Sequence, residues 1–368
     1  MIVFAGGGTG GHLYPGLAVI EALKAETGNS EAQDYLWIGN AKGMDRGIVE
    51  AAGVRFRGIP AGKLRREPSL KNLIDVFKVM AGVVASFVIL AKNRPSLVFS
   101  KGGYVSVPPV FAARLLKIPV CTHESDVTPG LATRINARSA RTIFLSYERT
   151  RAELPDKYRS ISVVAGNPVR AAIFSGSRER GRAILGVEPA LPVVFVIGGS
   201  QGARQINELV DAIIGELAKD ACVVHQTGEN NLGASYSSPR YVRKPYLRDE
   251  LPDILAAADV VVTRSGAGTL WECAALGKPT ILVPLAGSGT RGDQVINAEV
   301  FERAGASRVL VGSDATPERL LAELRALLGD ARLRGDMGAR AKSLCPSNPS
   351  TLIARELIGR GYTAGRRE

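Results

Sequence analysis

Short apolar runs of strand length alternate along this chain with longer segments whose apolar residues recur at helical spacing. The first run, residues 2–5, is followed by a glycine-rich turn and by residues 14–23, whose apolar positions have helical spacing. A strand, a glycine turn and a helix in this order are typical of an α/β domain that binds an anion at the turn. Further strands are predicted at residues 35–38, 97–100, 119–122, 142–145 and 162–164, with helices near 45–52, 69–91 and 108–117.

The same order begins again at residue 191. An apolar run over 191–197 precedes a second glycine-rich turn and a predicted helix over 205–218. Strands are then predicted at 222–226, 241–242, 260–263 and 280–283, with helices near 251–257 and around Trp271. A chain of 368 residues is long for one hydrophobic core. We therefore expect two Rossmann-like α/β domains in tandem, joined near Gly166, with a helix and a basic tail from about Ser350.

The segment from Arg55 to Lys101 is both basic and apolar. It holds ten Lys and Arg residues against Glu67 and Asp75, a net charge of +8 within the formal +12 of the chain. We predict a loop over 55–67 and then a helix capped by Ser69, apolar nearly all round in its later half. Spacing alone leaves core packing and membrane contact both open for this helix. The residues predicted to touch a membrane are Lys63, Arg65, Arg66, Leu73, Phe77 and Met80.

Composition excludes several classes of protein. The four cysteines are widely spaced with no C-x-x-C pair, which indicates reduced thiols and not zinc ligands or disulfides. No signal peptide is recognised, and the longest apolar run, 79–91, is shorter than the ~20 residues that span a bilayer. No D-x-D or H-x-x-x-H spacing occurs, so we predict no metal and no cofactor. The basic block is interleaved with aliphatic side chains and not with stacking aromatics, which argues against nucleic acid as a partner.

The glycine turn from Gly6 to His12 is the first candidate site. A Walker A loop would end in Gly-Lys-Ser/Thr, whereas this turn ends in Gly-His. A NAD site would have an acid after the second strand, where this chain has Gly39 and Asn40. What is left is a turn that places one imidazole at a helix N-terminus, where a neutral ring can accept a proton. A lone histidine is more often structural than catalytic, so the residues alone leave both roles open for His12, as a catalytic or ligand-contacting group or as a structural one. We interpret His225, in the middle of a strand, as a core residue.

Other turns are predicted to bind anions. Residues 198–202 follow a strand, and residues 265–269 open a helix whose N–H groups and dipole can hold a pyrophosphate. Glu272, one turn into that helix, is placed either to accept hydrogen bonds from a ribose diol or simply to be a first-turn acid. Residues 123–126, His-Glu-Ser-Asp, end another strand at the sheet edge where α/β proteins bind ligands. Together these features indicate a nucleotide-linked substrate.

Six motifs in order resemble the MurG family of peptidoglycan glycosyltransferases, which add N-acetylglucosamine to lipid I. They are residues 8–12 with Pro15-Gly16, 123–126 with Pro129-Gly130, 166–170, 198–203, 264–267, and Asp293-Gln294 with Asn297-Ala298. The resemblance covers the chain from residue 3 to about 300. It departs from some members at Asp293, where they have a glutamine, and at Ser125-Asp126, where they have Gln-Asn.

The resemblance implies a GT-B fold of two Rossmann-like domains facing across a cleft. Residues 1–165 would form the acceptor and membrane-facing domain, completed by a C-terminal helix at about 347–368, and residues 166–346 would bind the UDP-sugar. The reaction implied is inverting, metal-independent transfer from UDP-N-acetylglucosamine to the muramyl 4-hydroxyl of lipid I, giving lipid II. The protein would be peripheral on the cytoplasmic face of the cell membrane, in contact with anionic lipids and other cell-wall synthesis proteins. Roles in cell shape and cell division would follow.

Residue roles are also implied by this resemblance. His12 or Glu124 would take the proton, Arg170 and Ser200 would bind phosphate, and Leu247 would meet the uracil through its backbone. The full set implied for the sugar nucleotide is Thr9, Gly10, Gly11, Asp126, Arg170, Ser200, Gln201, Leu247, Ser265, Gly266, Ala267, Thr269, Glu272, Asp293 and Gln294.

Three other functions stay open at this point. A related GT-B glycolipid synthase would use a diacylglycerol acceptor in place of lipid I. A UDP-N-acetylglucosamine epimerase would share the domain layout and act on the donor with no acceptor present. A basic nucleotide- or nucleic-acid-binding module would show salt-dependent binding to oligonucleotides.

Overall fold

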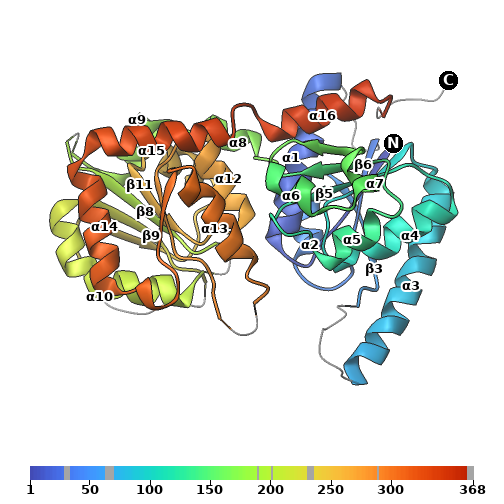
Figure 1. Cartoon of the computed structure of the whole chain (residues 1–368), viewed down its shortest axis with the longest axis horizontal. Coiled ribbons are helices and arrows are strands. Elements are labelled where there is room, and N and C mark those ends of the chain that lie inside the picture. The colour runs from blue at the N-terminus through green and yellow to red at the C-terminus, as the bar shows by residue number, and fades with distance from the viewer. Residues whose placement is uncertain are drawn as a thin grey trace. The chain divides into compact units, whose positions relative to one another are not determined.

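The computed structural model describes residues 1–28, 34–62, 70–188, 190–199, 202–229, 236–287 and 290–362, with the side chains of 70–74 left out. The chain divides into two compact units. Unit 1 comprises Met1–Pro168 with Asn348–Glu368, and unit 2 comprises Val169–Ser347. Each unit is an α/β domain built on one parallel sheet (Figure 1).

Unit 1 contains a seven-stranded parallel sheet in the order β3-β2-β1-β4-β5-β6-β7. Its strands are β1 (Ile2–Ala5), β2 (Tyr35–Asn40), β3 (Arg55–Ile59), β4 (Leu97–Ser100), β5 (Val120–Glu124), β6 (Thr142–Leu145) and β7 (Ser162–Val164). All residues of β1 are buried because helices cover both faces of the sheet. The chain begins in the middle of the sheet at β1 and proceeds to one edge at β3. It then returns to the middle at β4 and proceeds to the other edge at β7, as in Rossmann domains.

The helices of unit 1 form a layer on each face of this sheet. They are α1 (Gly10–Thr27), α2 (Asp45–Ala51), α3 (Leu70–Asn93), α4 (Val107–Leu115), α5 (Leu131–Asn136), α6 (Glu148–Glu153), α7 (Asp156–Arg159) and α16 (Pro349–Gly359). One core cluster joins the sheet to α1, α2 and α16, and another joins its opposite face to α3 and α4. The C-terminal helix α16 packs along α1 (Figure 1). There Ile353 and Leu357 are fully buried and Arg355 pairs with Glu26 at 2.9 Å.

The prediction of a loop over residues 55–67 is wrong for its first part. Arg55–Ile59 form the edge strand β3, paired in parallel with β2. Phe56 and Ile59 are buried whereas Arg55 and Arg57 are exposed, so the basic residues occupy the solvent side of an edge strand. Charged residues are common at such edges because they discourage pairing with a second sheet. Residues 63–69, including the predicted cap Ser69, lie outside the described residues.

Unit 2 repeats the architecture with a six-stranded parallel sheet in the order β10-β9-β8-β11-β12-β13. Its strands are β8 (Val193–Ile197), β9 (Cys222–Gln226), β10 (Tyr241–Lys244), β11 (Val260–Thr263), β12 (Thr280–Leu282) and β13 (Ser307–Val309). Its helices are α8 (Ala171–Phe174), α9 (Arg178–Leu185), α10 (Arg204–Asp220), α11 (Leu251–Ala257), α12 (Ala267–Ala275), α13 (Asp293–Arg303), α14 (Pro317–Gly329) and α15 (Ala331–Leu344). The apolar faces of α10 and α14 cover one side of this sheet.

The strands and helices predicted from apolar spacing are confirmed outside the 55–59 segment, with ends shifted by a few residues. Strand β13 was not predicted, because its three residues include Ser307 and Arg308 and form no apolar run. His225 is confirmed as a core residue. It is fully buried and hydrogen-bonded to Tyr241 and Asn207 at 2.9 and 3.0 Å. Burial lowers the pKa of its imidazole to about 3.

Gly16 allows α1 to approach the sheet closely. A Cβ atom at this position would lie 2.4 Å from Cη2 of the buried Trp37. We expect Gly16→Ala to lower the free energy of unfolding by about 1–3 kcal/mol, because the added methyl overpacks the core. Gly47→Ala, in α2 with nothing within 4 Å of its Cβ, is the matched control and should be neutral or slightly stabilising. Thermal unfolding of the two variants tests this, and equal midpoints would contradict it.

Candidate functional site

In unit 1 the strand order reverses between β1 and β4, and open α/β sheets bind ligands at the carboxyl ends of such strands. The glycine turn Gly6–Gly8 follows β1 and leads into α1, with Thr9 as N-cap. A second turn, Lys101–Gly103, follows β4. These two turns, far apart in sequence, therefore lie together at this edge of the sheet, because β1 and β4 are paired.

The first turn is held in place by hydrogen bonds to a buried carboxylate. Asp45 is 1% exposed, and its Oδ1 accepts the N–H of Gly8 at 3.0 Å. Its Oδ2 accepts the N–H of Asn40 at 2.8 Å. On the other side, the indole N–H of Trp37 donates to the carbonyl of Gly6 at 2.9 Å. These contacts hold the glycine turn and so direct the first turn of α1, which carries Gly10, Gly11 and His12.

His12 lies against the second turn. A Cβ atom on Gly103 would lie 2.9 Å from Cδ2 and 3.0 Å from Nε2 of the imidazole, so only glycine fits there. Gly102 and Gly103 also have φ values of +87° and +74°, which other residues rarely adopt. The backbone of the second turn therefore lies directly against one side of the imidazole ring. The half-buried His12 side chain has little freedom to rotate.

A buried polar network supports the second turn from beneath. Asn136 donates to the hydroxyl oxygens of Ser100 and Ser106 at 3.0 and 2.8 Å. Ser100 in turn accepts the N–H of Gly102 at 3.2 Å. Because buried polar groups are costly to leave unpaired, such a network favours one conformation of the turn. The preorganised wall beside His12 is what general acid–base chemistry requires.

Glu124 organises the loop that follows β5. Its Oε1 accepts the N–H groups of Ser125 and Asp126 at 2.8 and 3.1 Å, and its Oε2 accepts the N–H of Gly130 at 2.9 Å. Burial and the neighbouring Asp126 carboxylate raise the pKa of Glu124. With both oxygens occupied by backbone donors, Glu124 shapes the loop that carries Asp126, which is half-buried.

His123 is buried at the end of β5. In the sequence it stands out only as a member of the polar cluster 123–126, with no role predicted for it. Its Nε2 lies 3.0 Å from the carbonyl oxygen of Gly166, next to the predicted domain junction. Burial and the Lys101 ammonium hold the pKa of His123 well below its ordinary value. It is therefore neutral near pH 7 and ties the end of β5 to residue 166.

In unit 2 the strand order reverses between β8 and β11, and the predicted turns follow these two strands. Ser200 and Gln201 of the first turn lie outside the described residues. The second turn leads into α12, whose N-cap is Gly266 and whose first turn contains Ala267 and Thr269. An N-cap without a side chain leaves the N-terminal turn accessible to an anion.

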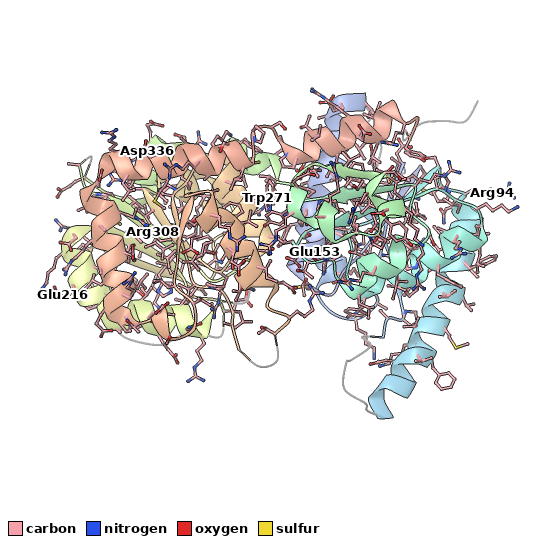
Figure 2. All side chains as sticks on the ribbon, viewed as in Figure 1. Arg94, Glu153, Glu216, Trp271, Arg308 and Asp336 are labelled. Carbon is pink, nitrogen blue, oxygen red and sulfur yellow. The ribbon has the colours of Figure 1, made fainter. Side chains whose placement is uncertain are left out.

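Arg170 and Glu272 meet beside the start of α12. The Nε and one terminal nitrogen of Arg170 each lie 2.8 Å from Oε1 of Glu272. Burial raises the pKa of the Glu272 carboxyl, and the Arg170 guanidinium acts in the opposite direction. The two side chains that were expected to bind phosphate and ribose therefore form an ion pair with each other. Trp271, labelled in Figure 2, anchors the same helix. Its ring packs edge-on against that of Phe301.

The start of α13 is joined to the same turn. The hydroxyl of Ser265 donates to the backbone carbonyl of Gln294 at 2.5 Å, and Asn297 donates to the carbonyl of Ser265 at 3.3 Å. The side-chain oxygen of Gln294 accepts the N–H of Leu285 at 2.8 Å. Asp293 pairs with Arg291 at 2.5 Å. These contacts bring residues 265–269 and 293–294 together.

Leu247 lies just after the edge strand β10. Its N–H donates to the side-chain oxygen of Gln226 at 2.9 Å, and the residue is buried. The backbone N–H of Leu247 is therefore already hydrogen-bonded within the protein. Its backbone carbonyl is the group that remains to contact a uracil base.

Both units match one family of glycosyltransferases. Residues 2–145 match the glycosyltransferase family 28 N-terminal domain, and residues 193–343 match its C-terminal domain. A relative from Treponema denticola, 48% identical over 96% of both chains, is named UDP-N-acetylglucosamine–N-acetylmuramyl-(pentapeptide) pyrophosphoryl-undecaprenol N-acetylglucosamine transferase. A relative of the same name, numbered 2, from Bacillus cereus is 42% identical over 89% of this chain and 91% of its own. The chain belongs to the MurG family.

Solved structures confirm the predicted α/β GT-B fold. The structure of Acinetobacter baumannii MurG has a TM-score of 0.71 at 23% identity, covering 98% of this chain and 99% of its own. A UDP-GlcNAc 2-epimerase from Neisseria meningitidis also shares the fold, with a TM-score of 0.66 at 14% identity over 97% of this chain and 99% of its own. The fold is thus common to transferases and epimerases, and membership of the MurG family, a family of hexosyltransferases, rests on sequence identity.

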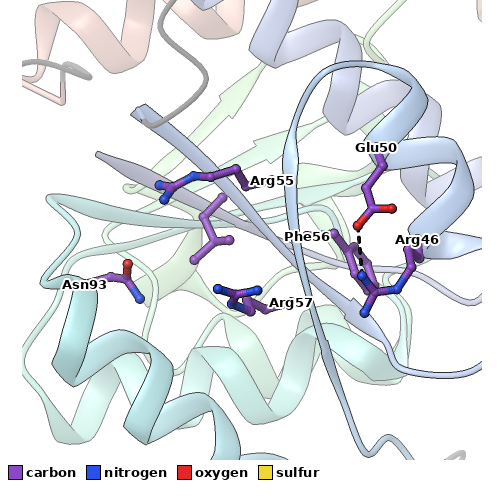
Figure 3. Close-up of a pocket in the computed structure, with 7 residues that line it drawn as sticks. Arg46, Glu50, Arg55, Phe56, Arg57 and Asn93 are labelled. Carbon is purple, nitrogen blue, oxygen red and sulfur yellow. Dashed lines mark hydrogen bonds and ion pairs between the residues drawn. The ribbon is translucent and has the colours of Figure 1, made fainter.

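A separate pocket of about 220 Å³ lies at the amino-terminal end of β3, away from the residues that resemble MurG sites (Figure 3). Its walls include Arg55 and Arg57, with Asn93 on one side and the Arg46–Glu50 ion pair on the other. Its basic rim adds to the positive charge of unit 1, but it contains none of the predicted site residues.

The four cysteines, Cys121, Cys222, Cys273 and Cys345, are buried and free. Within the described ranges, no group of three or more His, Cys, Asp or Glu side chains is arranged to hold a metal ion. In the same ranges, no helix is long and apolar enough to span a bilayer.

Proposed function

We propose that the protein transfers N-acetylglucosamine from UDP-N-acetylglucosamine to the muramyl 4-hydroxyl of undecaprenyl-pyrophosphoryl-N-acetylmuramyl-pentapeptide (lipid I), giving lipid II with inversion. The observation that carries the proposal is 48% identity, over 96% of both chains, to a relative whose name states this donor and this acceptor. The arrangement of His12 in unit 1 and of Arg170 and Glu272 in unit 2 supplies the chemistry.

On the acceptor side, His12 accepts the proton of the attacking hydroxyl. Glu124 is the weaker choice because three backbone N–H groups already occupy its carboxylate. The backbone wall of Gly102 and Gly103 fixes the imidazole, as a general base requires. Thr9, Gly10 and Gly11 present the N-terminal turn of α1 to the negatively charged donor.

On the donor side, charge develops on UDP as the bond to the anomeric carbon breaks. Arg170 and the N-terminal turn of α12 neutralise this charge without a metal ion. Glu272 accepts hydrogen bonds from the ribose diol, so binding of UDP must replace or share its ion pair with Arg170. The contacts to phosphate, sugar and uracil are completed by Ser265, Gln294 and the carbonyl of Leu247. The further members of the proposed donor-binding set are Asp126, Ser200, Gln201, Gly266, Ala267, Thr269 and Asp293.

A peripheral position on the cytoplasmic face of the cell membrane is part of the proposal. One face of α3 packs on unit 1 through Asp75, Ser86 and Leu90. A Cβ atom on Gly82 would lie 2.4 Å from the carbonyl oxygen of Pro60, so the helix approaches this backbone closely. The opposite face exposes large apolar side chains, with Phe77 63% and Met80 60% exposed. Val76, Val84, Phe87 and Val88 extend this apolar row along α3, and Phe111 and Leu115 are exposed on the neighbouring α4.

Basic side chains accompany this apolar row. Those exposed on or next to α3 and α4 are Lys78, Lys92, Arg94, Arg114 and Lys117. Arg94 projects away from unit 1 just beyond the end of α3 (Figure 2). Apolar side chains ringed by bases suit the surface of a bilayer that contains anionic lipids. Lys63, Arg65, Arg66 and the side chain of Leu73 belong to the proposed contact but lie outside the described residues.

Replacing Phe77 and Met80 together by serine should weaken binding to vesicles containing phosphatidylglycerol by at least about tenfold, because two large apolar side chains no longer leave water. Ile184→Ser, which removes an equally exposed apolar side chain from α9 in unit 2, is the matched control. Cosedimentation with vesicles measures the binding. Unchanged binding of the double variant would contradict the membrane contact.

The transfer itself is tested by UDP release. The purified chain would be mixed with UDP-N-acetylglucosamine and a short-chain lipid I analogue in EDTA. Release that requires the acceptor supports the proposal, including its independence of metal. Release without acceptor would indicate hydrolysis instead, and conversion of the donor to another UDP-sugar without net release of UDP would indicate epimerisation. No release with lipid I but release with diacylglycerol would indicate the glycolipid synthase.

A further inference from the structure

A buried lysine lies behind the proposed acceptor site and has no role in the reaction described so far. Lys101 is the first residue of the turn after β4 and is 1% exposed. Lysine is almost never fully buried unless its charge is compensated. Its ammonium Nζ donates to the hydroxyl of Ser125 at 2.5 Å, and the carboxylates of Glu124 and Asp126 attract it electrostatically.

The same short turn touches His12. Lys101 is anchored to the loop after β5, while Gly103, two residues further on, forms the wall against the imidazole. The backbone N–H of Lys101 also donates to the carbonyl of Ala5 at 2.8 Å, at the end of β1. Three residues thus connect the His12 turn, the β4 turn and the loop that carries Asp126.

We infer that Lys101 is a positioning residue for the proposed transfer: it is the internal counter-ion that holds the Ser125–Asp126 loop and the Gly102–Gly103 wall in register beside His12. Both carboxylates attract the ammonium, Glu124 more than Asp126, and Glu124 also accepts three backbone N–H groups that shape the loop. The inference rests on the proposed function, because its effect is read at the acceptor site.

The charged and titratable groups around Lys101 decide the expected pH dependence. Glu124 and Asp126 face it from the end of β5, and the neutral His123 lies on the same strand end. Burial lowers the pKa of Lys101 to about 8, and the two carboxylates act in the opposite direction. As pH rises through about 8 the ammonium loses its proton and the loop loses its counter-ion. The rate of transfer should therefore fall on this alkaline limb.

A double-mutant cycle tests the inference. Lys101→Met should lower kcat for UDP release with lipid I by at least about tenfold and remove the alkaline limb, with KM for UDP-N-acetylglucosamine changed less than about twofold. In the Asp126→Asn background, where only the Glu124 carboxylate still faces Lys101, the same substitution should lower kcat less than about threefold. An equal loss in both backgrounds would overturn the inference.

Two further readouts keep the test decisive. If Lys101→Met does not fold, Asp126→Asn alone must flatten the alkaline limb to a fall of less than about threefold, because the Ser125–Asp126 loop then depends less on the Lys101 ammonium. A limb as steep as that of the wild-type chain would overturn the inference. If the wild-type chain shows no acceptor-dependent release, the proposed function fails. The cycle is then read from thermal unfolding midpoints, where additive effects of the two substitutions would overturn the counter-ion role.

Discussion

Replacing His12 by alanine should lower kcat for acceptor-dependent UDP release by about 10²- to 10⁴-fold, the range that a general base contributes. The physical reason is that the substitution removes the group that takes the proton as the hydroxyl attacks. Because this interaction forms only in the transition state, KM for lipid I should change little. Steady-state kinetics with a short-chain lipid I analogue measures both parameters.

Two comparisons make the His12 result specific. UDP binding by the variant, measured by calorimetry, should stay within about threefold of wild type, because Arg170 and Glu272 are untouched. Glu124→Gln is the companion variant, since it retains an oxygen for the loop N–H groups and removes the carboxylate. A larger loss of kcat in Glu124→Gln than in His12→Ala would reverse the assignment of the base.

Replacing Arg170 by alanine should lower kcat/KM for the donor by about 10²- to 10³-fold, comparable with the loss of one preorganised donor to a developing anion. Two effects combine in this variant. The leaving diphosphate loses a cation, and the Glu272 carboxylate, whose side chain is only 12% exposed, is left without its ion-pair partner. Leaving one charge of such a pair buried is strongly unfavourable.

The second effect predicts a pH dependence. Arg170 lowers the pKa of Glu272 against the effect of burial, so its removal must raise that pKa further. As the pH is lowered, Glu272 therefore becomes protonated earlier in Arg170→Ala than in the wild-type chain. The affinity for UDP should accordingly fall at a higher pH in the variant. Calorimetric titrations with UDP at several pH values measure the shift.

A second arginine in the same unit provides the control. Arg178 pairs with Asp259 at 2.8 Å at the amino-terminal end of β11, at the opposite end of the strand from the proposed donor site. Arg178→Ala should leave kcat/KM within about threefold of wild type. Equal losses in Arg170→Ala and Arg178→Ala would indicate a general loss of stability in unit 2 and contradict the phosphate role of Arg170.

The sequence alone determined the fold class and indicated most residues of the candidate site. Apolar spacing is a local property, so the strand β1, the helix α1 and their repetition at β8 and α10 could be predicted residue by residue. The glycine turns could be predicted as well, because a strand followed by glycines and a helix has one usual geometry. The order of the motifs indicated the family, which the comparisons confirm.

The tertiary structure decided what depends on neighbours distant in sequence. Arg55–Ile59 is a strand because β2 pairs with it, although its bases suggested a loop. Glu124 could have been a base or a loop anchor, and only its three backbone donors distinguish the two. Lys101 counted as one more surface base until the fold placed it beside Ser125. The environment of a charge, and hence its role, is set by the elements packed around it, and no local pattern contains that information.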